Sequence, residues 1–292
     1  MATPYVLLLP ALAVIVAVLG YPLYRLVTLS FQEYGLPELI AHKGRWIGLD
    51  NYTEILGDGL FWTVLGRTVA FTAVTVGLTM VFGTLIALLL ARLGTFMRLL
   101  ITTGLVLVWS MPPVVSVNIW SWMVDYEFGV LNWSLTQLGL DHFAHHDWFV
   151  NPIEGFAVIT AIVVWGAIPF VAITIFAGLT QVSAEMVEAA EIDGAGSFRI
   201  FRDITLPILK PIFVILASLS VIWNFQVFSQ IWIIRNARPE DHYFLLSIYS
   251  FVESFNTSRY GLGSAIALVM VMAMLGVTFV YIRQMVRIGE IE

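Results

Sequence analysis

The chain has 292 residues, of which 59% are hydrophobic and 12% charged, and its mean hydropathy is +0.89. Soluble globular domains carry about a quarter charged residues, so the composition excludes that class and indicates an integral membrane protein. The sequence has no cysteine, which excludes disulfides, thiol chemistry and cysteine-ligated zinc, and its net charge of -6 argues against a nucleic-acid partner.

Long apolar runs define the predicted elements. A membrane-spanning helix needs about 20 apolar residues. Runs of this kind lie at approximately 6–30, 64–91, 99–123, 155–180, 208–234 and 261–284. Their length and their Gly and Ala content favour helices packed on helices over the short alternating strands of a barrel. The prediction is a single all-α polytopic membrane domain over 1–292, with about six transmembrane helices.

The first run resembles a signal peptide only in its position. The preceding stretch "MATPY" has no Lys or Arg, and the apolar region is longer than the hydrophobic part of a signal peptide. We therefore interpret 6–30 as a span. The very short leading stretch leaves open whether the native chain begins earlier.

Two connecting segments have a character of their own. The segment 31–60 is polar and contains Gly and Pro, as expected of a loop with short elements. In 125–153, the stretch "FGVLNWSLTQLGL" (128–140) predicts a short helix with one apolar face, which could lie at the membrane interface or pack on its own bundle. "HFAHHD" (142–147) is read as a solvated loop in preference to a metal site.

The segment 183–207 is polar, although apolar runs flank it on both sides. Ser183 is a suitable cap for a helix over 184–192, and "DGAG" (193–196) ends that helix with glycines that accept a left-handed turn. Ser197 is predicted to cap a second short helix, and Pro207 and Pro211 suit first helical turns at the entry to the next span. By pattern alone, this helix-turn-helix could equally be a solvated surface loop.

The spacing within this segment is more specific. Glu188-Ala189-Ala190 is followed by three residues, Gly194, nine residues and then Ile204-Thr205-Leu206-Pro207. This arrangement resembles the EAA loop of binding-protein-dependent ABC importer permeases. "GLDNY" (48–52), "MPPVVSVNIWSWM" with "FGVLN", and "YGLGSAIA" (260–267) resemble other motifs of the carbohydrate branch, so the resemblance covers nearly the whole chain. The chain is similar to the larger membrane subunit of the maltose type.

The resemblance implies a type I importer permease fold in a bacterial or archaeal cytoplasmic membrane. Its EAA loop would form a coupling helix that inserts into a groove on an ABC ATPase dimer. A second permease subunit would complete the pathway through the lipid bilayer, and an external solute-binding protein would deliver a di- or oligosaccharide to the outer loops. The residues carried over for ATPase coupling are Glu188, Ala189, Ala190, Asp193, Gly194, Ile204, Leu206 and Pro207.

Nucleotide chemistry is expected to belong to a partner. The sequence has no G-x-x-x-x-G-K-S/T motif, and its only lysines are Lys43 and Lys210. We therefore expect this subunit not to be an enzyme and to bind no cofactor, with ATP and Mg used by the partner ATPase. The resemblance also places the EAA loop on the cytoplasmic side, which the Lys and Arg distribution does not decide because seven of the 14 lie on each side.

Polar residues within the fourth and fifth runs are candidates for the substrate pathway. Ser220, Asn224 and Gln226 lie at membrane depth, where they could bridge helices or contact a ligand. Pro169 removes one hydrogen bond from its helix, and Gly166 permits close approach to the backbone. The resemblance favours the ligand and adds Trp165, Ala167 and Phe170. Val163 and Val227 depart from it, because the maltose-type permease has asparagines there.

Three alternatives stay open from the sequence. An ion-coupled secondary transporter is disfavoured, since no span centre carries a clear charge. A membrane scaffold would leave the polar groups of the spans without a role. A permease for glycerol-3-phosphate or another polyol is a third possibility, and neither the sugar nor the subunit that holds it is specified.

Overall fold

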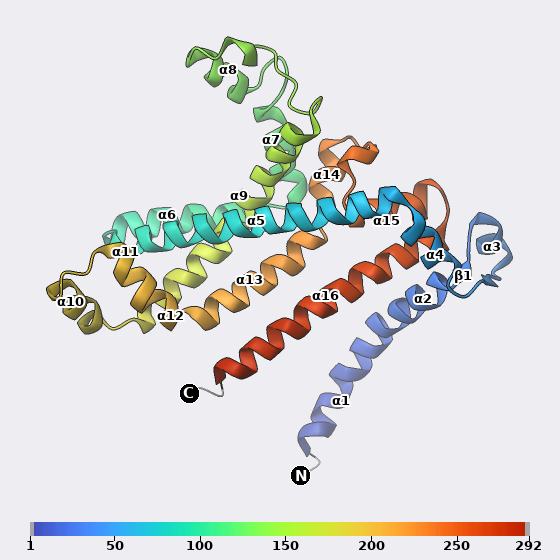
Figure 1. Cartoon of the computed structure of the whole chain (residues 1–292), viewed down its shortest axis with the longest axis horizontal. Coiled ribbons are helices and arrows are strands. Elements are labelled where there is room, and N and C mark those ends of the chain that lie inside the picture. Colours follow the sequence, from blue (N-terminus) through green and yellow to red (C-terminus); the bar gives the residue numbers. More distant parts are fainter. Residues whose placement is uncertain (1–2, 290–292) are drawn as a thin grey trace. The chain divides into compact units, whose positions relative to one another are not determined.

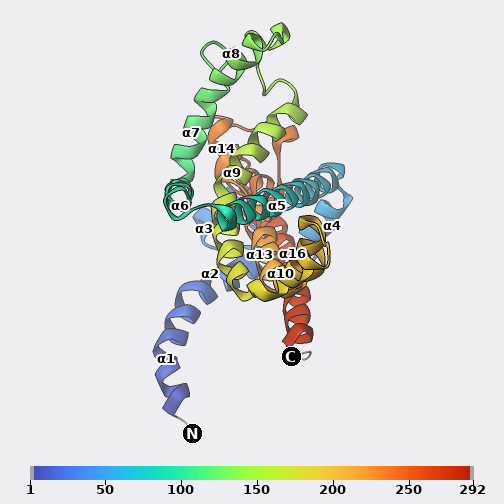
Figure 2. The same ribbon diagram turned by 90° about the vertical axis from the view of Figure 1, so that its left-hand side faces the viewer.

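The computed structural model describes residues 3–289, and the side chains of residues 8–286 (Figure 1 and Figure 2). Met1 and Ala2, which bear on the question of an earlier start, lie outside this part. The α-helices are α1 (Thr3–Ile15), α2 (Tyr21–Ser30), α3 (Leu36–Ala41), α4 (Asp50–Gly57), α5 (Gly59–Arg92), α6 (Thr95–Trp109), α7 (Pro113–Met123), α8 (Val130–Gln137), α9 (Pro152–Gly178), α10 (Ala184–Ile192), α11 (Ser197–Ile200), α12 (Leu206–Ile208), α13 (Lys210–Phe225), α14 (Ser229–Ile234), α15 (Leu246–Phe251) and α16 (Tyr260–Gly289). Two short strands, β1 (Gln32–Glu33) and β2 (Arg45–Trp46), pair antiparallel. Three π-helical turns lie at Val16–Gly20, Phe201–Thr205 and Val252–Asn256.

The described residues include five helical segments that are long and apolar enough to cross a membrane. They are Leu8–Ser30, Gly59–Arg92, Pro152–Gln181, Lys210–Ile234 and Tyr260–Val286. The pair α6 and α7 makes a sixth if it is counted as one span. The prediction of an all-α membrane protein with about six spans is therefore confirmed. In Leu8–Ser30, the most apolar stretch has no buried residue.

The third span is not the continuous helix predicted over 99–123. α6 and α7 are bent by 102° relative to each other. The break falls at Ser110–Pro112, just before a second proline at position 113. A residue that precedes proline is driven out of the helical region, and Pro112 accordingly has an extended ψ of 144°. Two consecutive prolines therefore end one helix and start the next in a new direction.

The chain divides into two compact units, Met1–Thr68 with Phe244–Leu275, and Val69–Tyr243 with Gly276–Glu292. In the second unit α9 is the central helix, because it packs against α6, α7, α13 and α14. Its core includes a buried cluster formed by Ala87, Val171, Ile175, Leu209 and Leu216. This cluster joins α5, α9 and the residues around the start of α13, so it fixes the elements that carry both candidate sites.

The first unit explains one of the sequence motifs. In "GLDNY", the Asn51 amide donates to the carbonyl oxygens of Ser30 (2.9 Å) and Gln32 (3.0 Å), and Tyr52 donates to the Ser30 hydroxyl (2.7 Å). The backbone N–H of Gly261 donates to Tyr34 at 3.0 Å. The two motifs at 48–52 and 260–267 therefore hold the strand region between α2 and α3.

The predicted short helix in 128–140 is present as α8, and the side chain that it buries is polar. Asn132 is 4% exposed, whereas Trp133 is 64% exposed. The Asn132 Oδ1 accepts from Trp148 Nε1 at 2.7 Å, and its amide donates to the carbonyl of His146 at 2.8 Å. His146 in turn lies 2.9 Å from a Glu154 oxygen. Within residues 3–289, no three His, Cys, Asp or Glu side chains form a group that could hold a metal.

Gly155 provides a test of packing in the second unit. A Cβ at this position would lie 2.1 Å from the hydroxyl of Tyr243, which is fully buried and donates to the carbonyl of Phe149 at 2.9 Å. We expect Gly155→Ala to destabilise the protein by about 1–3 kcal/mol, because overpacking a rigid ring outweighs the helix preference for alanine. Thermal unfolding followed by tryptophan fluorescence would measure this.

The matched control is Gly77→Ala, since a Cβ at Gly77 meets nothing within 4 Å. Its melting temperature is expected to stay the same or rise. Equal melting temperatures for the two variants would contradict the packing argument.

Candidate functional site

The first candidate site is the loop 183–207. α10 begins as predicted, because the Ser183 hydroxyl accepts a hydrogen bond from the backbone N–H of Met186 at 3.2 Å. The second predicted cap is wrong: Gly196 precedes α11, and Ser197 is its first residue. Glycine takes the extended N-cap conformation readily, which leaves the Ser197 side chain free to line a cavity described below.

α10 ends in a tight turn over residues 190–195, which is called the hook below. Gly194 has φ +80°, its N–H donates to Glu191, and the N–H of Ala195 donates back to Ala190 at 2.9 Å. These two bonds, with a left-handed residue between them, form a Schellman motif. The predicted left-handed turn at Gly194 is therefore present, and it fixes the direction in which the chain leaves α10.

The segment that follows the hook is packed against the membrane core. Ile204 and Leu206 are half-buried, and Leu209 is fully buried in the cluster that joins α5, α9 and α13. Pro207 and Pro211 occupy first helical turns, as predicted. The segment from Ile204 to Leu209 is therefore held by packing at the start of α13.

The two sides of α10 differ. Val187 and Glu191, four residues apart and so on one face, line a cavity within the second unit. Glu188, Ala189 and Asp193 are exposed. An exposed face with a carboxylate and a small residue is accessible to another protein.

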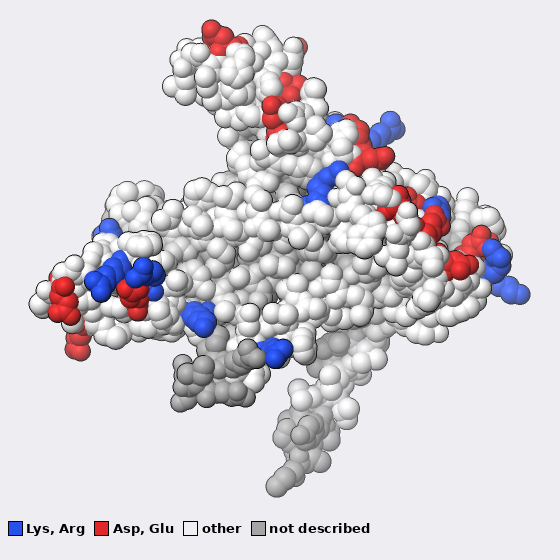
Figure 3. Space-filling view, in the orientation of Figure 1, with Lys and Arg blue, Asp and Glu red and all other residues white. Residues whose placement is uncertain are grey.

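Charges gather over this loop in the space-filling view (Figure 3, at the left of the view). Arg202 Nε donates to Asp203 at 2.7 Å, and Arg199 lies 3.6 Å from the same carboxylate. The hydrogen bond from Arg202 lowers the pKa of Asp203 below its usual value. These groups are exposed to solvent, where ion pairs contribute little to stability, so they mark a polar surface.

The second candidate site is a cavity of about 390 Å³ between α6, α7, α9, α13 and α14. Six of the seven predicted pathway residues line it: Trp165, Gly166, Ala167, Phe170, Ser220 and Asn224. The seventh, Gln226, follows the last residue of α13, is exposed and donates to the carbonyl of Ile222 at 3.1 Å. The structure therefore brings six of these residues, from the fourth and fifth spans, together at one cavity and leaves Gln226 outside it.

Aromatic rings form one wall of this cavity. Phe170 stacks on Trp109 with ring centroids 6.1 Å apart, and it meets Trp223 edge to face at 5.3 Å. Trp109, Ser116, Trp223 and Gln230 also line the cavity and were not predicted. Val163 and Val227, where the sequence departs from the maltose-type pattern, lie in the same lining.

Asn224 is the polar centre of the cavity. It is 3% exposed, and its Nδ2 donates to the carbonyl of Ser220 at 2.7 Å. Its Oδ1 has no hydrogen-bond partner among the described residues. A buried amide oxygen without a partner costs about 1–3 kcal/mol, which a ligand hydroxyl in the cavity would recover.

Pro169 adds a backbone feature to the same wall. α9 continues without interruption through Pro169. Proline has no N–H, so the carbonyl of Trp165 loses the donor that an ordinary residue at 169 would supply.

The family of the chain follows from comparison with known proteins. Residues 80–288 match the family described as "Binding-protein-dependent transport system inner membrane component". The chain belongs to this family. It is therefore a membrane component of a transport system, and not a secondary transporter or a scaffold.

Relatives of this binding-protein-dependent family are similar over nearly their whole length. The diacetylchitobiose uptake system permease protein DasB of Streptomyces coelicolor is 42% identical over 99% of this chain and 88% of the relative. The sulfoquinovosyl glycerol transport system permease protein SmoG of Agrobacterium fabrum is 34% identical over 95% of this chain and 88% of the relative. A crystal structure of a bacterial ABC transporter involved in the import of alginate contains a chain of the same fold, with a TM-score of 0.82, 19% identity, and coverage of 98% and 96%.

Proposed function

We propose that this chain is one of two permease subunits of an ABC importer for a neutral di- or oligosaccharide. The observation that carries the proposal is the unpaired Oδ1 of Asn224 in an aromatic-lined cavity at membrane depth. Hydroxyl donors and the apolar face of a pyranose ring match an amide acceptor and aromatic rings. The volume of about 390 Å³ lies within the usual range of small-molecule sites.

The lining of the cavity favours a neutral substrate over a phosphorylated one. None of its residues is Asp, Glu, Lys or Arg. A phosphate group is normally held by Arg or Lys, so glycerol-3-phosphate would lose its hydration without gaining a counter-charge. The substrates named for the two relatives, diacetylchitobiose and sulfoquinovosyl glycerol, are both glycosides, which supports a carbohydrate. Diacetylchitobiose is neutral, whereas sulfoquinovosyl glycerol carries a sulfonate, so the neutral charge rests on the lining of the cavity.

The hook at the end of α10 supports coupling to a partner ATPase. In this proposal Glu188, Ala189 and Asp193 contact a groove on one ATPase subunit, and Gly194 sets the exit angle. Ile204, Leu206 and Pro207 transmit the movement to α13 through Leu209. ATP and Mg belong to the ATPase dimer. A second permease completes the pathway across a bacterial or archaeal cytoplasmic membrane, and an external solute-binding protein delivers the sugar to its outer loops.

Reconstitution with the partner subunits tests the proposal. We expect proteoliposomes with ATP and Mg inside to accumulate a neutral disaccharide such as diacetylchitobiose when the solute-binding protein is outside. Uptake is expected to persist after the ion gradients are collapsed. Uptake of glycerol-3-phosphate in preference to every neutral sugar, or a requirement for an ion gradient, would overturn the assignment.

A further inference from the structure

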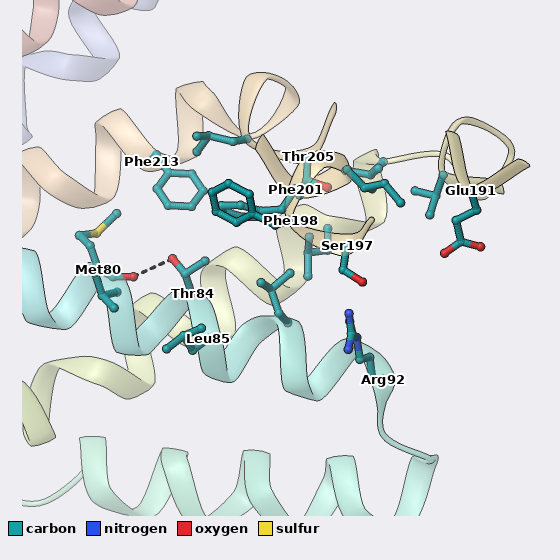
Figure 4. A pocket seen from close by; sticks show the side chains of 18 residues that line it. Met80, Thr84, Leu85, Arg92, Glu191, Ser197, Phe198, Phe201, Thr205 and Phe213 are labelled. Carbon is teal, nitrogen blue, oxygen red and sulfur yellow. Dashed lines mark hydrogen bonds between the residues drawn. The ribbon is translucent and has the colours of Figure 1, made fainter. Parts of the chain in front are cut away.

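A second cavity, of about 840 Å³, lies beside the hook and shares no lining residue with the sugar cavity. Figure 4 shows its wall of apolar side chains from α5, from the segment between α11 and α12, and from α13. Met80, Leu85, Phe201 and Phe213 form this wall. Thr84, which also lines it, donates its hydroxyl hydrogen to the carbonyl of Met80 at 2.6 Å, so it offers the cavity little polarity.

The charged side chains of the lining lie at one end of this cavity. Arg92, the last residue of α5, points toward Ser197 in Figure 4, and Glu191 of α10 lies at the same end. Among residues 3–289, the side chains of Arg92 and Glu191 form no ion pair or hydrogen bond with another residue. The mouth therefore carries one positive and one negative charge, each without a protein partner in the described part of the chain.

The cavity lies where three membrane spans end. Arg92 ends the span Gly59–Arg92, Leu179 lies near the end of Pro152–Gln181, and Phe213 lies near the start of Lys210–Ile234. The twelve residue-to-residue steps from Met80 to Arg92 rise roughly 18 Å along α5. One leaflet of the hydrocarbon core is about 15 Å thick. The apolar wall thus runs through the depth of one leaflet, and the charged mouth lies at headgroup level.

We propose that this cavity binds one phosphatidylethanolamine molecule from the leaflet on the α10 side. One acyl chain lies along Met80, Leu85 and Phe213. The phosphate accepts hydrogen bonds from Arg92 and Ser197, and the ammonium group donates to Glu191.

The charges of Arg92 and Glu191 favour phosphatidylethanolamine over the other two common headgroups. Phosphatidylglycerol would satisfy Arg92 but would place a negative headgroup beside Glu191 with no cation to compensate. Phosphatidylcholine carries the cation, but its quaternary nitrogen has no N–H to donate. Phosphatidylethanolamine supplies both the phosphate and the N–H donors, and charge-assisted hydrogen bonds are the stronger kind.

A soluble ATPase is a poorer occupant of the cavity. Val81 and Leu85, which are 56% and 57% exposed, line it at a depth within the span. Ala189 is exposed on the side of α10 opposite to Val187 and Glu191, and neither Glu188 nor Ala189 lines the cavity. Lipid and ATPase can therefore occupy the two sides of α10 together.

Native mass spectrometry of the full-length protein tests the proposal, with phosphatidylethanolamine, phosphatidylglycerol and phosphatidylcholine of identical acyl chains titrated into the detergent. We expect one saturable phosphatidylethanolamine, bound about tenfold more tightly than either other lipid. Arg92→Gln and Glu191→Gln are each expected to remove about that factor. Leu85→Trp is expected to block the acyl-chain position.

Two matched variants separate the site from general effects. Arg199→Gln removes an exposed arginine of the same loop that does not line the cavity. Leu89→Trp adds a large ring on the same helix, at a residue that is 49% exposed and outside the lining. Both are expected to bind phosphatidylethanolamine like the unmodified protein. Equal binding of the three lipids, or equal losses in Arg92→Gln and Arg199→Gln, would overturn the proposal.

Discussion

Asn224→Leu is expected to reduce the initial rate of sugar uptake by about tenfold or more. Leucine has a similar size, so the cavity keeps its shape while the unpaired amide oxygen is removed. A substrate hydroxyl gives up its hydrogen bond to water when it enters the cavity. In the variant it would find no amide oxygen at position 224 to accept a new one. The measurement is uptake of radiolabelled sugar by proteoliposomes that contain the partner subunits, with ATP inside.

Gln226→Leu is the matched control, because Gln226 lies two residues away and is exposed outside the cavity. Its uptake is expected to stay within a factor of about two. Size-exclusion chromatography would verify that both variants assemble with their partners. Normal transport by Asn224→Leu would count against the cavity as the sugar site.

Gly194→Asp is expected to uncouple ATP hydrolysis from uptake. The left-handed conformation at φ +80° costs a residue with a side chain about 1–2 kcal/mol, with Asp toward the lower end. Release of the Schellman motif would let α10 leave the loop at another angle, while the spans stay folded. The number of sugar molecules imported per ATP hydrolysed should therefore fall, and the melting temperature should change little.

Gly196→Asp adds the same charge two residues away and serves as the control. Gly196 has φ -74° and ψ 161° and is the N-cap of α11, a position where Asp is favoured. Its transport stoichiometry is expected to be unchanged. Glu188→Ala should behave like Gly194→Asp if the exposed carboxylate contacts the ATPase. A preserved ratio of sugar to ATP in both Gly194→Asp and Glu188→Ala would refute the coupling role.

The features predicted correctly from the sequence are those that depend on a single residue or on a short stretch of the chain. Ser183 as a cap and Gly194 as a left-handed turn follow from the preferences of single residue types, and both are present. The spans follow from apolar length. The break between α6 and α7 was missed because the count of apolar residues continued through Pro112 and Pro113.

Side-chain direction was harder to predict. Each helical residue turns by about 100°, so residues two positions apart point in nearly opposite directions. Gln226 lies two positions after Asn224 and accordingly is exposed outside the cavity that Asn224 lines. Trp109 and Trp223 were missed for a related reason: their contact with Phe170 joins three separate helices and leaves no spacing signal in the chain.

The lack of buried residues in the first span has a thermodynamic consequence. In the apolar stretch within Leu8–Ser30, no side chain is buried by packing against the rest of the chain. Its folding free energy is then set by the solvent around it, lipid or detergent, and by the intrinsic stability of a single helix. In a calorimetric melting curve of the isolated subunit, the heat absorbed would therefore come from unfolding of the core around α9. Melting of this first helix would contribute little to it.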